Sequence, residues 1–284
     1  MSFNNLSKTF RYVNENGGTL VFDYAHGYII NKPVGIDTIQ VNLSQAQTID
    51  QVGGTVQSAT VQARPVTVSG RIVGEAGEAR KDALMSIVRP DIPGKLYADD
   101  YFLEVYVTAT PTVGPQAKYA HFQFSMNAAY PYWQKASKTR QALFGVEKLF
   151  KFPWNMSRAY QFGRLMRTQF VNVANSGQLP VPFVATFTAT DTVENPRITN
   201  AQTGEWFQLN KTLVPGETVV VENTHSRTYV TSSEDGDIRG ALDLDSTLFR
   251  LNVGDNVLKP EADTGPEYLD VQITYALEKP GVTV

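Results

Sequence analysis

Acidic side chains are concentrated in one segment of the chain, and carboxylates this close in sequence are candidate ligands for a metal ion. The segment carries five carboxylates, at Glu234, Asp235, Asp237, Asp243 and Asp245. Carboxylate oxygens suit calcium, but their spacing here differs from that of the EF-hand loop. A solvated hairpin with an acidic turn accounts for the same pattern. The segment therefore predicts a hairpin and no metal site.

The residue types that enzymes use as nucleophiles and bases are scarce. The chain has no cysteine and only three histidines, His26, His121 and His225, each in or beside a predicted turn or strand start. No Gly-x-Ser-x-Gly, P-loop or His-Glu-x-x-His motif occurs. Hydrolysis of a glycan would need two acids close together in a cleft, and no spacing singles out such a pair. We therefore expect no enzymatic activity, no catalytic residue and no cofactor.

Composition limits the remaining classes of function. The chain has 284 residues, 42% of them hydrophobic, and a formal net charge of −3. This length suits two domains, and the charge argues against a dedicated nucleic-acid-binding protein. No apolar run is long enough to cross a bilayer, and the N-terminus lacks the pattern of a secretory signal. We therefore expect neither a membrane partner nor a specific nucleic-acid partner.

Basic residues are concentrated between residues 134 and 170, an interval that contains eight of them and only one acidic residue, Glu147. They are Lys135, Lys138, Arg140, Lys148, Lys151, Arg158, Arg164 and Arg167. Two interpretations stay open. The stretch could be a solvated connection between domains, or a basic face that meets an acidic neighbour such as another copy of the chain.

Alternating apolar and polar residues predict mostly strands. The clearest patterns cover 66–73, 101–107, 185–189 and 269–278. One convincing helix is expected at about 75–89, with an apolar stripe and prolines beyond its end. A second, short helix is expected between 134 and 150. Many strands with one clear helix predict a mainly β protein.

One strand pattern ends in a distinctive way. The alternating residues from Phe122 to Met126 run into Pro131, Tyr132 and Trp133, and the basic stretch begins directly afterwards. Proline cannot donate to a sheet ladder, so it ends the strand. We expect these three residues to form a structural domain junction, with the Trp133 indole buried.

A short motif in the second half is similar to a sugar-binding sequence. Asn195-Pro196-Arg197 resembles the Asn-Pro-Arg core of the galectins, and Trp206 follows nearby. The galectin pattern also has a histidine two residues before the asparagine, where this chain has Val193. Asn195, Arg197 and Trp206 are therefore weak candidates for glycan contacts, and we expect Asn195 and Arg197 to fix the turn and pair with a carboxylate.

Taken in order, the motifs resemble the siphophage distal tail protein family. The matching runs in the first half include 64–72, 80–87 and 130–133, and those in the second half include 195–200, 213–217 and 251–256. The order and spacing of these runs, more than any one of them, carry the resemblance, which extends over nearly the whole chain.

The resemblance implies a mainly β fold with an N-terminal split-barrel or β-sandwich "belt" domain that contains one helix. It places this ring-forming domain at 1–134 and a galectin-like β-sandwich at 135–284, which includes the basic stretch 135–170. It also implies a structural hub of a phage tail tip, a homohexameric ring that joins the tail tube to the baseplate. The partners would be other copies, the tail tube protein, the baseplate hub or tail-associated protein and a receptor-binding protein. The protein would be made in the bacterial cytoplasm and end in the virion tail tip. The alternative is a carbohydrate-binding module that contacts the host cell wall.

Overall fold

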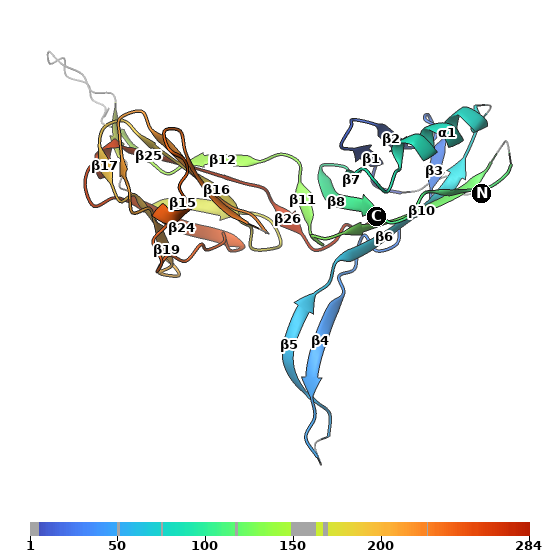
Figure 1. Ribbon diagram of the computed structural model, residues 1–284, viewed down its shortest axis with the longest axis horizontal. Helices are drawn as coiled ribbons and strands as arrows, with labels where there is room; N and C mark the ends of the chain where they lie inside the picture. Colours follow the sequence, from blue (N-terminus) through green and yellow to red (C-terminus); the bar gives the residue numbers. More distant parts are fainter. Residues whose placement is uncertain are drawn as a thin grey trace, which may run out of the picture. The chain divides into compact units, whose positions relative to one another are not determined.

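A computed structural model describes residues 6–49, 52–74, 76–116, 119–148, 163–166, 170–225 and 227–284. The chain forms two compact units (Figure 1). Unit 1 contains Met1–Ala136 and Glu278–Val284, and unit 2 contains Ser137–Leu277. The chain therefore leaves unit 1, builds unit 2 and returns. The sequence motifs place all residues after 134 in the second domain and do not anticipate this return.

Unit 1 is built on one large antiparallel sheet. Its main path is β2 (Thr19–Phe22), β1 (Phe10–Asn14), β7 (Gly94–Ala98), β8 (Tyr101–Val107), β10 (His121–Ala128), β6 (Arg64–Ile72) and β3 (Tyr28–Ile30). The end strands β2 and β3 contact each other, so the sheet nearly closes into a barrel. Three short strands, β9 (Thr112–Val113), β11 (Trp133–Lys135) and β26 (Glu278–Lys279), pair beside this path.

The barrel encloses the core of unit 1. Alternate residues of β10 point inward, and Phe122, Phe124 and Met126 are buried there. This is the periodicity that the sequence shows, because successive strand residues face opposite sides of a sheet. The predicted helix is α1 (Gly77–Ile87), and Leu84 and Val88 bury its apolar side in the same core.

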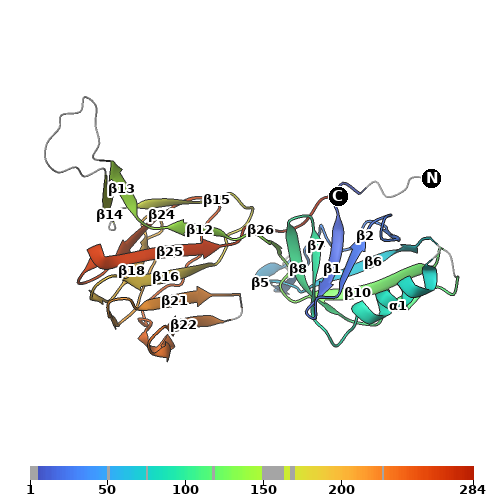
Figure 2. The ribbon, with the colours of Figure 1, turned by 90° about the horizontal axis from the view of Figure 1, so that it is seen from above.

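Unit 2 is a sandwich of two main antiparallel sheets (Figure 2). The larger sheet runs in the order β12 (Thr139–Ala142), β25 (Leu269–Tyr275), β16 (Phe183–Ala189), β21 (Thr218–Asn223), β22 (Thr228–Ser232) and β23 (Gly236–Asp237). The other runs β15 (Val171–Asn175), β24 (Gly254–Glu261), β18 (Arg197–Asn200) and β19 (Trp206–Gln208). Buried residues from both sheets, such as Phe187 and Phe207, form one core.

The remaining elements of unit 2 are small. They are the strand pairs β13 (Gly145–Lys148) with β14 (Gly163–Met166) and β17 (Val193–Glu194) with β20 (Thr212–Leu213), and the 3₁₀ helices η1 (Arg239–Ala241) and η2 (Pro266–Tyr268). The mainly β architecture predicted from the sequence is confirmed.

The helix expected between 134 and 150 is wrong for the described residues. Residues 139–142 form β12, which pairs with β25 more than a hundred positions later in the chain. Residues 145–148 form β13. A distant partner strand satisfies the backbone of β12, and no local sequence signal could reveal it. The predicted strand at 269–278, by contrast, is present as β25 with alternating burial.

No helix in the described ranges combines the length and the apolar character that a bilayer crossing requires.

Candidate functional site

A hairpin arm, residues 40–62, projects from unit 1 (Figure 1). It consists of β4 (Val41–Ala46) and β5 (Thr55–Val61), which pair only with each other among the described strands. Every described residue of both strands is exposed. An isolated two-stranded hairpin is marginally stable in water, because it has no core on which to pack. The arm therefore has the properties of an element that a partner completes.

The two faces of the arm differ in chemistry. One face carries the opposed pairs Val41–Val61 and Leu43–Ala59, and the other carries Asn42–Thr60 and Ser44–Ser58. Val41 and Leu43 are each 48% exposed, and Val61 is 41% exposed. Apolar residues that alternate with polar ones are the pattern of a strand with one buried face. In the arm of a single chain, that face lies open to solvent.

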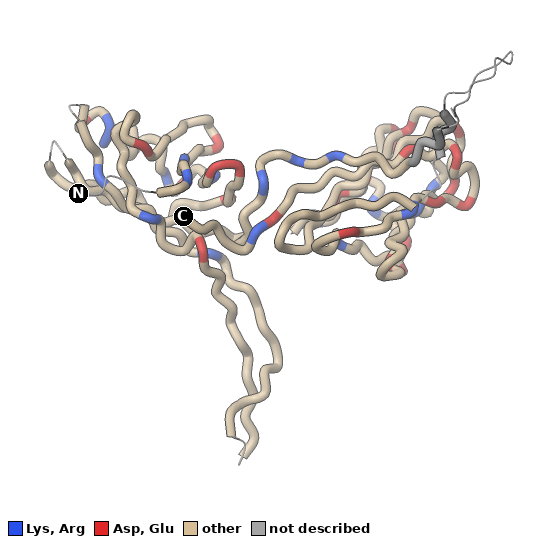
Figure 3. Tube along the Cα trace, turned by 180° about the vertical axis from the view of Figure 1, so that it is seen from behind, with Lys and Arg blue, Asp and Glu red and all other residues tan. Residues whose placement is uncertain are grey.

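The arm also lacks the features that usually protect sheet edges. Asp50 is the only charged residue between Thr38 and Ala63, and that interval contains no proline. Figure 3 shows the described part of the arm without charge along its strands. Lysine, proline and short strands normally keep exposed edges from pairing with other chains. Both outer edges of the arm are therefore open to pairing.

The predicted junction residues belong to unit 1 and come shortly before its boundary at Ala136. Trp133 is fully buried in the core of unit 1, and its Nε1 donates to the carbonyl of Ile36 at 3.0 Å. Pro131 is buried, and Tyr132 is half-buried with its ring 5.3 Å from that of Tyr130. Trp133 also begins β11, which pairs with the returning strand β26. The burial predicted for the indole is thus observed.

The galectin-like motif lies on the solvent side of the β18–β19 pair. Asn195 has a left-handed backbone, with φ of 51°, and its Nδ2 donates to Asp263 at 2.8 Å. Arg197 Nη2 donates to Glu261 at 3.1 Å. Both residues therefore pair with carboxylates, as the sequence predicts. The Trp206 ring is half-buried, and the Arg197 guanidinium lies 5.8 Å from its centre.

Glu261 is the centre of the polar contacts on this face. It accepts hydrogen bonds from Thr199 Oγ1 at 2.7 Å and Lys259 Nζ at 2.8 Å in addition to the one from Arg197. Burial acts to raise the pKa of Glu261, but the bonds from Lys259 and Thr199 and the charge of Arg197 outweigh it and hold that pKa below its usual value. The carboxylate is ionised and already satisfied, so it offers little unused capacity for a sugar hydroxyl.

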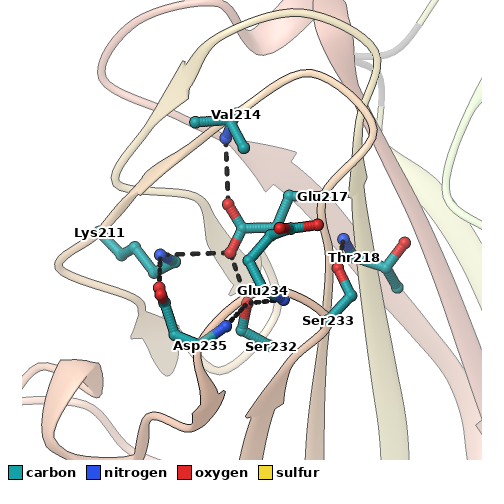
Figure 4. Close-up of polar contacts among 8 residues, drawn as sticks. All are labelled: Lys211, Val214, Glu217, Thr218, Ser232, Ser233, Glu234 and Asp235. Carbon is teal, nitrogen blue, oxygen red and sulfur yellow. Dashed lines mark hydrogen bonds and ion pairs between the residues drawn. The ribbon is translucent and has the colours of Figure 1, made fainter.

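The acidic segment begins in a hairpin, as the sequence predicts, with Thr231 opposite Asp237. Asp235 bonds to Lys211 at 2.5 Å, and Lys211 also lies 3.2 Å from the buried Glu217 (Figure 4). Asp243 accepts from Asn210 Nδ2 at 2.8 Å. No group of three potential metal ligands occurs in the part of the chain that the structure describes. The contacts of Asp235 and Asp243 instead hold the acidic segment against neighbouring parts of unit 2.

The sequence motifs do not predict the arm. The glycine pair Gly53-Gly54 indicates a loop but not a projecting hairpin. The available signal is a charge-poor stretch from 38 to 63 whose two alternating halves flank the glycine pair. Charge-free length on an exposed strand is itself the indication of an interface.

Comparison with known proteins gives one family-model match and several similar folds. Residues 176–277 match the family model for the siphovirus-type tail component, C-terminal domain. No curated protein sequence matches the chain. Among solved structures, the fold is similar to that of the SPP1 Dit (gp 19.1) protein, described as a paradigm of the hub adsorption apparatus in phages that infect Gram-positive bacteria. The identity is 12%, the match covers 95% of this chain and 99% of that one, and the TM-score is 0.70.

A chain of the phage P2 baseplate in its activated conformation with calcium is also similar, with 10% identity, coverage of 98% and 100%, and a TM-score of 0.50. The similarity to SPP1 Dit extends over both units, so the fold as a whole is shared. Residues 176–277 of unit 2 thus match the C-terminal domain model of the siphovirus-type tail component, and the resemblance of the chain to the siphophage distal tail proteins is confirmed.

Proposed function

We propose that the protein is a structural hub of a siphophage tail tip, in which copies of unit 1 close into a ring, a homohexamer by family resemblance. In this proposal the ring joins the tail tube protein to the baseplate hub or tail-associated protein, and a receptor-binding protein is a further neighbour. The protein has no catalytic role and resides in the virion after synthesis in the bacterial cytoplasm. The family match of unit 2 and the fold shared with SPP1 Dit support this assignment.

The observation that carries the proposal is the arm. It has two open edges, one apolar face and no charge on its strands. When β4 of one copy pairs with β5 of the next, each copy uses two different edges, and such a head-to-tail contact closes a ring if the rotation allows it. The apolar face then leaves water, at about 25 cal/mol for each Å² buried. Specific assembly, not chemistry on a substrate, is what this element is suited to do.

The test compares two variants that carry the same added charge on opposite faces of the arm. Val41→Lys with Val61→Lys charges the apolar face, whereas Asn42→Lys with Thr60→Lys charges the polar face. Each variant places its two lysines directly opposite each other in the hairpin register, so the repulsion across the ladder is matched. We expect the wild type to form a discrete oligomer in light scattering across a concentration series. The apolar-face variant should raise the dissociation constant by at least about tenfold, which is about 1.4 kcal/mol.

The polar-face variant is the matched control for charge and strand propensity, and we expect it to assemble more tightly than its counterpart. Circular dichroism would verify that each variant keeps its β structure. A wild type that stays monomeric at high concentration and shows no rings in electron micrographs would refute the proposal. Equal assembly by all three proteins would remove the arm from the interface.

Carbohydrate binding by unit 2 is the second candidate, and one observation favours it: Arg197 and Trp206 lie together on a solvent-facing sheet surface. Asn195 Nδ2 and Arg197 Nη2 are, however, already bonded to Asp263 and Glu261, and the Arg197 Nε, which has no hydrogen-bond partner among the described residues, is buried away from solvent. A bound sugar would have to replace these charge-assisted bonds, which are among the stronger hydrogen bonds in proteins. The hub assignment therefore ranks first.

A further inference from the structure

One buried cation holds the base of the arm. Arg64 follows β5, begins β6, and is 2% exposed. Its guanidinium donates only to backbone carbonyls. Nε bonds to Pro131 at 2.7 Å, Nη1 to Gly35 at 3.0 Å and to Ile36 at 2.7 Å, and Nη2 to Pro280. Among the described residues no carboxylate is in ion-pair contact with the guanidinium; the charge of Asp37, which is paired with Lys32, acts on it without direct contact. A well-packed apolar side chain of similar size would avoid the energetic cost of burying a charge. Stability alone therefore does not explain why an arginine occupies this position.

The four carbonyls belong to three separate segments. Gly35 and Ile36 lie just before the arm, Pro131 lies on the path from unit 1 to unit 2, and Pro280 lies on the path back. On these outgoing and returning paths, β11 and β26 pair with each other through Trp133–Lys279 and Gln134–Glu278. We call this β11–β26 pair the stem. Arg64 is thus bonded both to the base of the arm and to the segments on either side of the stem.

A single carbonyl provides the second connection. The oxygen of Ile36 accepts not only from Arg64 but also from Trp133 Nε1 at 3.0 Å and from the amide of Val282 at 3.1 Å. The backbones around it are close. A Cβ on Gly35, which has φ of +89°, would lie 2.1 Å from the Pro65 oxygen. A displacement of Ile36 would therefore change bonds to the arm and to the stem together.

We infer that Arg64 couples the arm to the stem, so that a partner that fixes the arm also fixes the strands through which the chain passes to and from unit 2. The side chain must be arginine, because a planar fork can reach three segments at once, whereas a lysine ammonium is compact. The second half of this inference rests on the proposed assembly through the arm. The first half, that Arg64 holds three segments as one piece, concerns the single chain and is tested without assembly.

The first experiment measures hydrogen exchange by mass spectrometry on dilute, unassembled protein. In Arg64→Lys we expect exchange to rise at least about tenfold in three peptides together, those containing Ile36, β11 and residues 278–282. The β6–β10 core should change little. Asn14→Ala is the matched control, because it removes another anchor of unit 1, which donates to the Ile87 carbonyl and accepts from the Gly18 amide. Its effect should stay near Gly18 and Ile87.

If Arg64→Lys does not fold, Trp133→Phe keeps an aromatic ring but removes the Nε1 donor to Ile36, and it should raise exchange in the same three peptides by a smaller factor. A rise confined to one segment, or a uniform rise across unit 1, would overturn the inference for either variant.

The second experiment repeats the measurement at high concentration. Assembly should protect the arm in both proteins but should protect the stem more in the wild type than in Arg64→Lys. Equal stem protection in the two would overturn the coupling. A wild type that never assembles would refute the proposed ring, and the dilute comparison would still decide the role of Arg64.

Discussion

At the scale of single residues, Glu217 is a buried carboxylate of unit 2 that several donors hold in place. It is 1% exposed, accepts from Ser232 Oγ at 2.6 Å and from the Val214 amide at 3.0 Å, and lies beside Lys211 (Figure 4). Burial acts to raise the pKa of Glu217, but these hydrogen bonds and the lysine charge outweigh it and bring that pKa below its usual value. The ionised form thus ties the loop after β20 to the β22–β23 turn.

Replacing this carboxylate should destabilise unit 2 in a pH-dependent way. We expect Glu217→Gln to lower the free energy of unfolding at pH 7 by about 1–3 kcal/mol, because buried donors lose an acceptor of the right charge. A lowered pKa in the folded state stabilises the protein above the unfolded value of about 4.3, and this contribution is lost as the pH falls through the folded value. Urea unfolding from pH 7 to pH 3 should show the two proteins converge.

Glu234→Gln is the control for this prediction, since Glu234 is an exposed carboxylate in the same turn. It should change the unfolding free energy little at any pH. A Glu217→Gln deficit that stayed constant down to pH 3 would mean that packing, and not ionisation, is what the carboxylate contributes.

The residues of the galectin-like motif lead to a prediction about binding. Because Asn195 and Arg197 already bond to carboxylates, we expect no galactoside to bind with sub-millimolar affinity. Calorimetry of the full chain with galactose and lactose checks this. Saturable binding that Arg197→Ala abolishes without unfolding the chain would contradict it and would favour the carbohydrate-binding alternative.

At the scale of elements, the sequence predicts those strands that bury one face in the core of their own chain. β10 and β25 alternate between core and solvent, so their periodicity alone identifies them. The carboxylate pairing of Asn195 and Arg197 was also predictable, because the galectin-like set lacks its histidine at Val193 and the two polar side chains then need other partners. The arm was not predictable in this way, because its apolar face has no cover in the chain itself. The four carbonyls around Arg64 were not predictable either, since they come from segments up to 216 positions apart.

One glycine determines how closely two strands of unit 1 approach. A Cβ on Gly70 in β6 would lie 2.2 Å from the carbonyl oxygen of Ile29 in β3. We therefore expect Gly70→Ala to push β3 away from β6 and to lower the free energy of unfolding by about 1–3 kcal/mol, the usual range for overpacking. Thermal unfolding measures the loss.

The neighbouring change Ser69→Ala is the control for this substitution, because Ser69 is half-buried in the same strand. It should cost less than Gly70→Ala. Equal stability of Gly70→Ala and the wild type would mean that β3 moves without strain and does not close the barrel.

At the scale of the whole molecule, the two units have separate cores and meet in sequence at Ala136 and Ser137. Lys138 and Arg140, just after this boundary, are exposed. We expect a protease of low specificity to cut between Lys135 and Arg140 before it cuts between Phe122 and Met126, which lie in the β10 core strand. Mass spectrometry of the early fragments identifies the site.

Strand β26 gives this digestion a second expected result. It belongs to the C-terminal fragment but pairs with β11 in unit 1, and Pro280 there is bonded to Arg64. The fragments should therefore remain together on a sizing column until denaturant is added. Early cleavage inside β10, or a single cooperative unfolding transition for the whole chain, would argue for one merged domain.

The pairing of Gln134 with Glu278 makes unit 2 a cassette. Its two ends lie on adjacent strands, so a tight turn could join them, or another domain with neighbouring termini could take its place, without new topology in unit 1. A tag placed after Val284 would report on the unit that carries the arm and not on the sandwich. Exchange of unit 2 by recombination would likewise require two crossovers, one after β11 and one before β26, and would leave unit 1 and its arm intact.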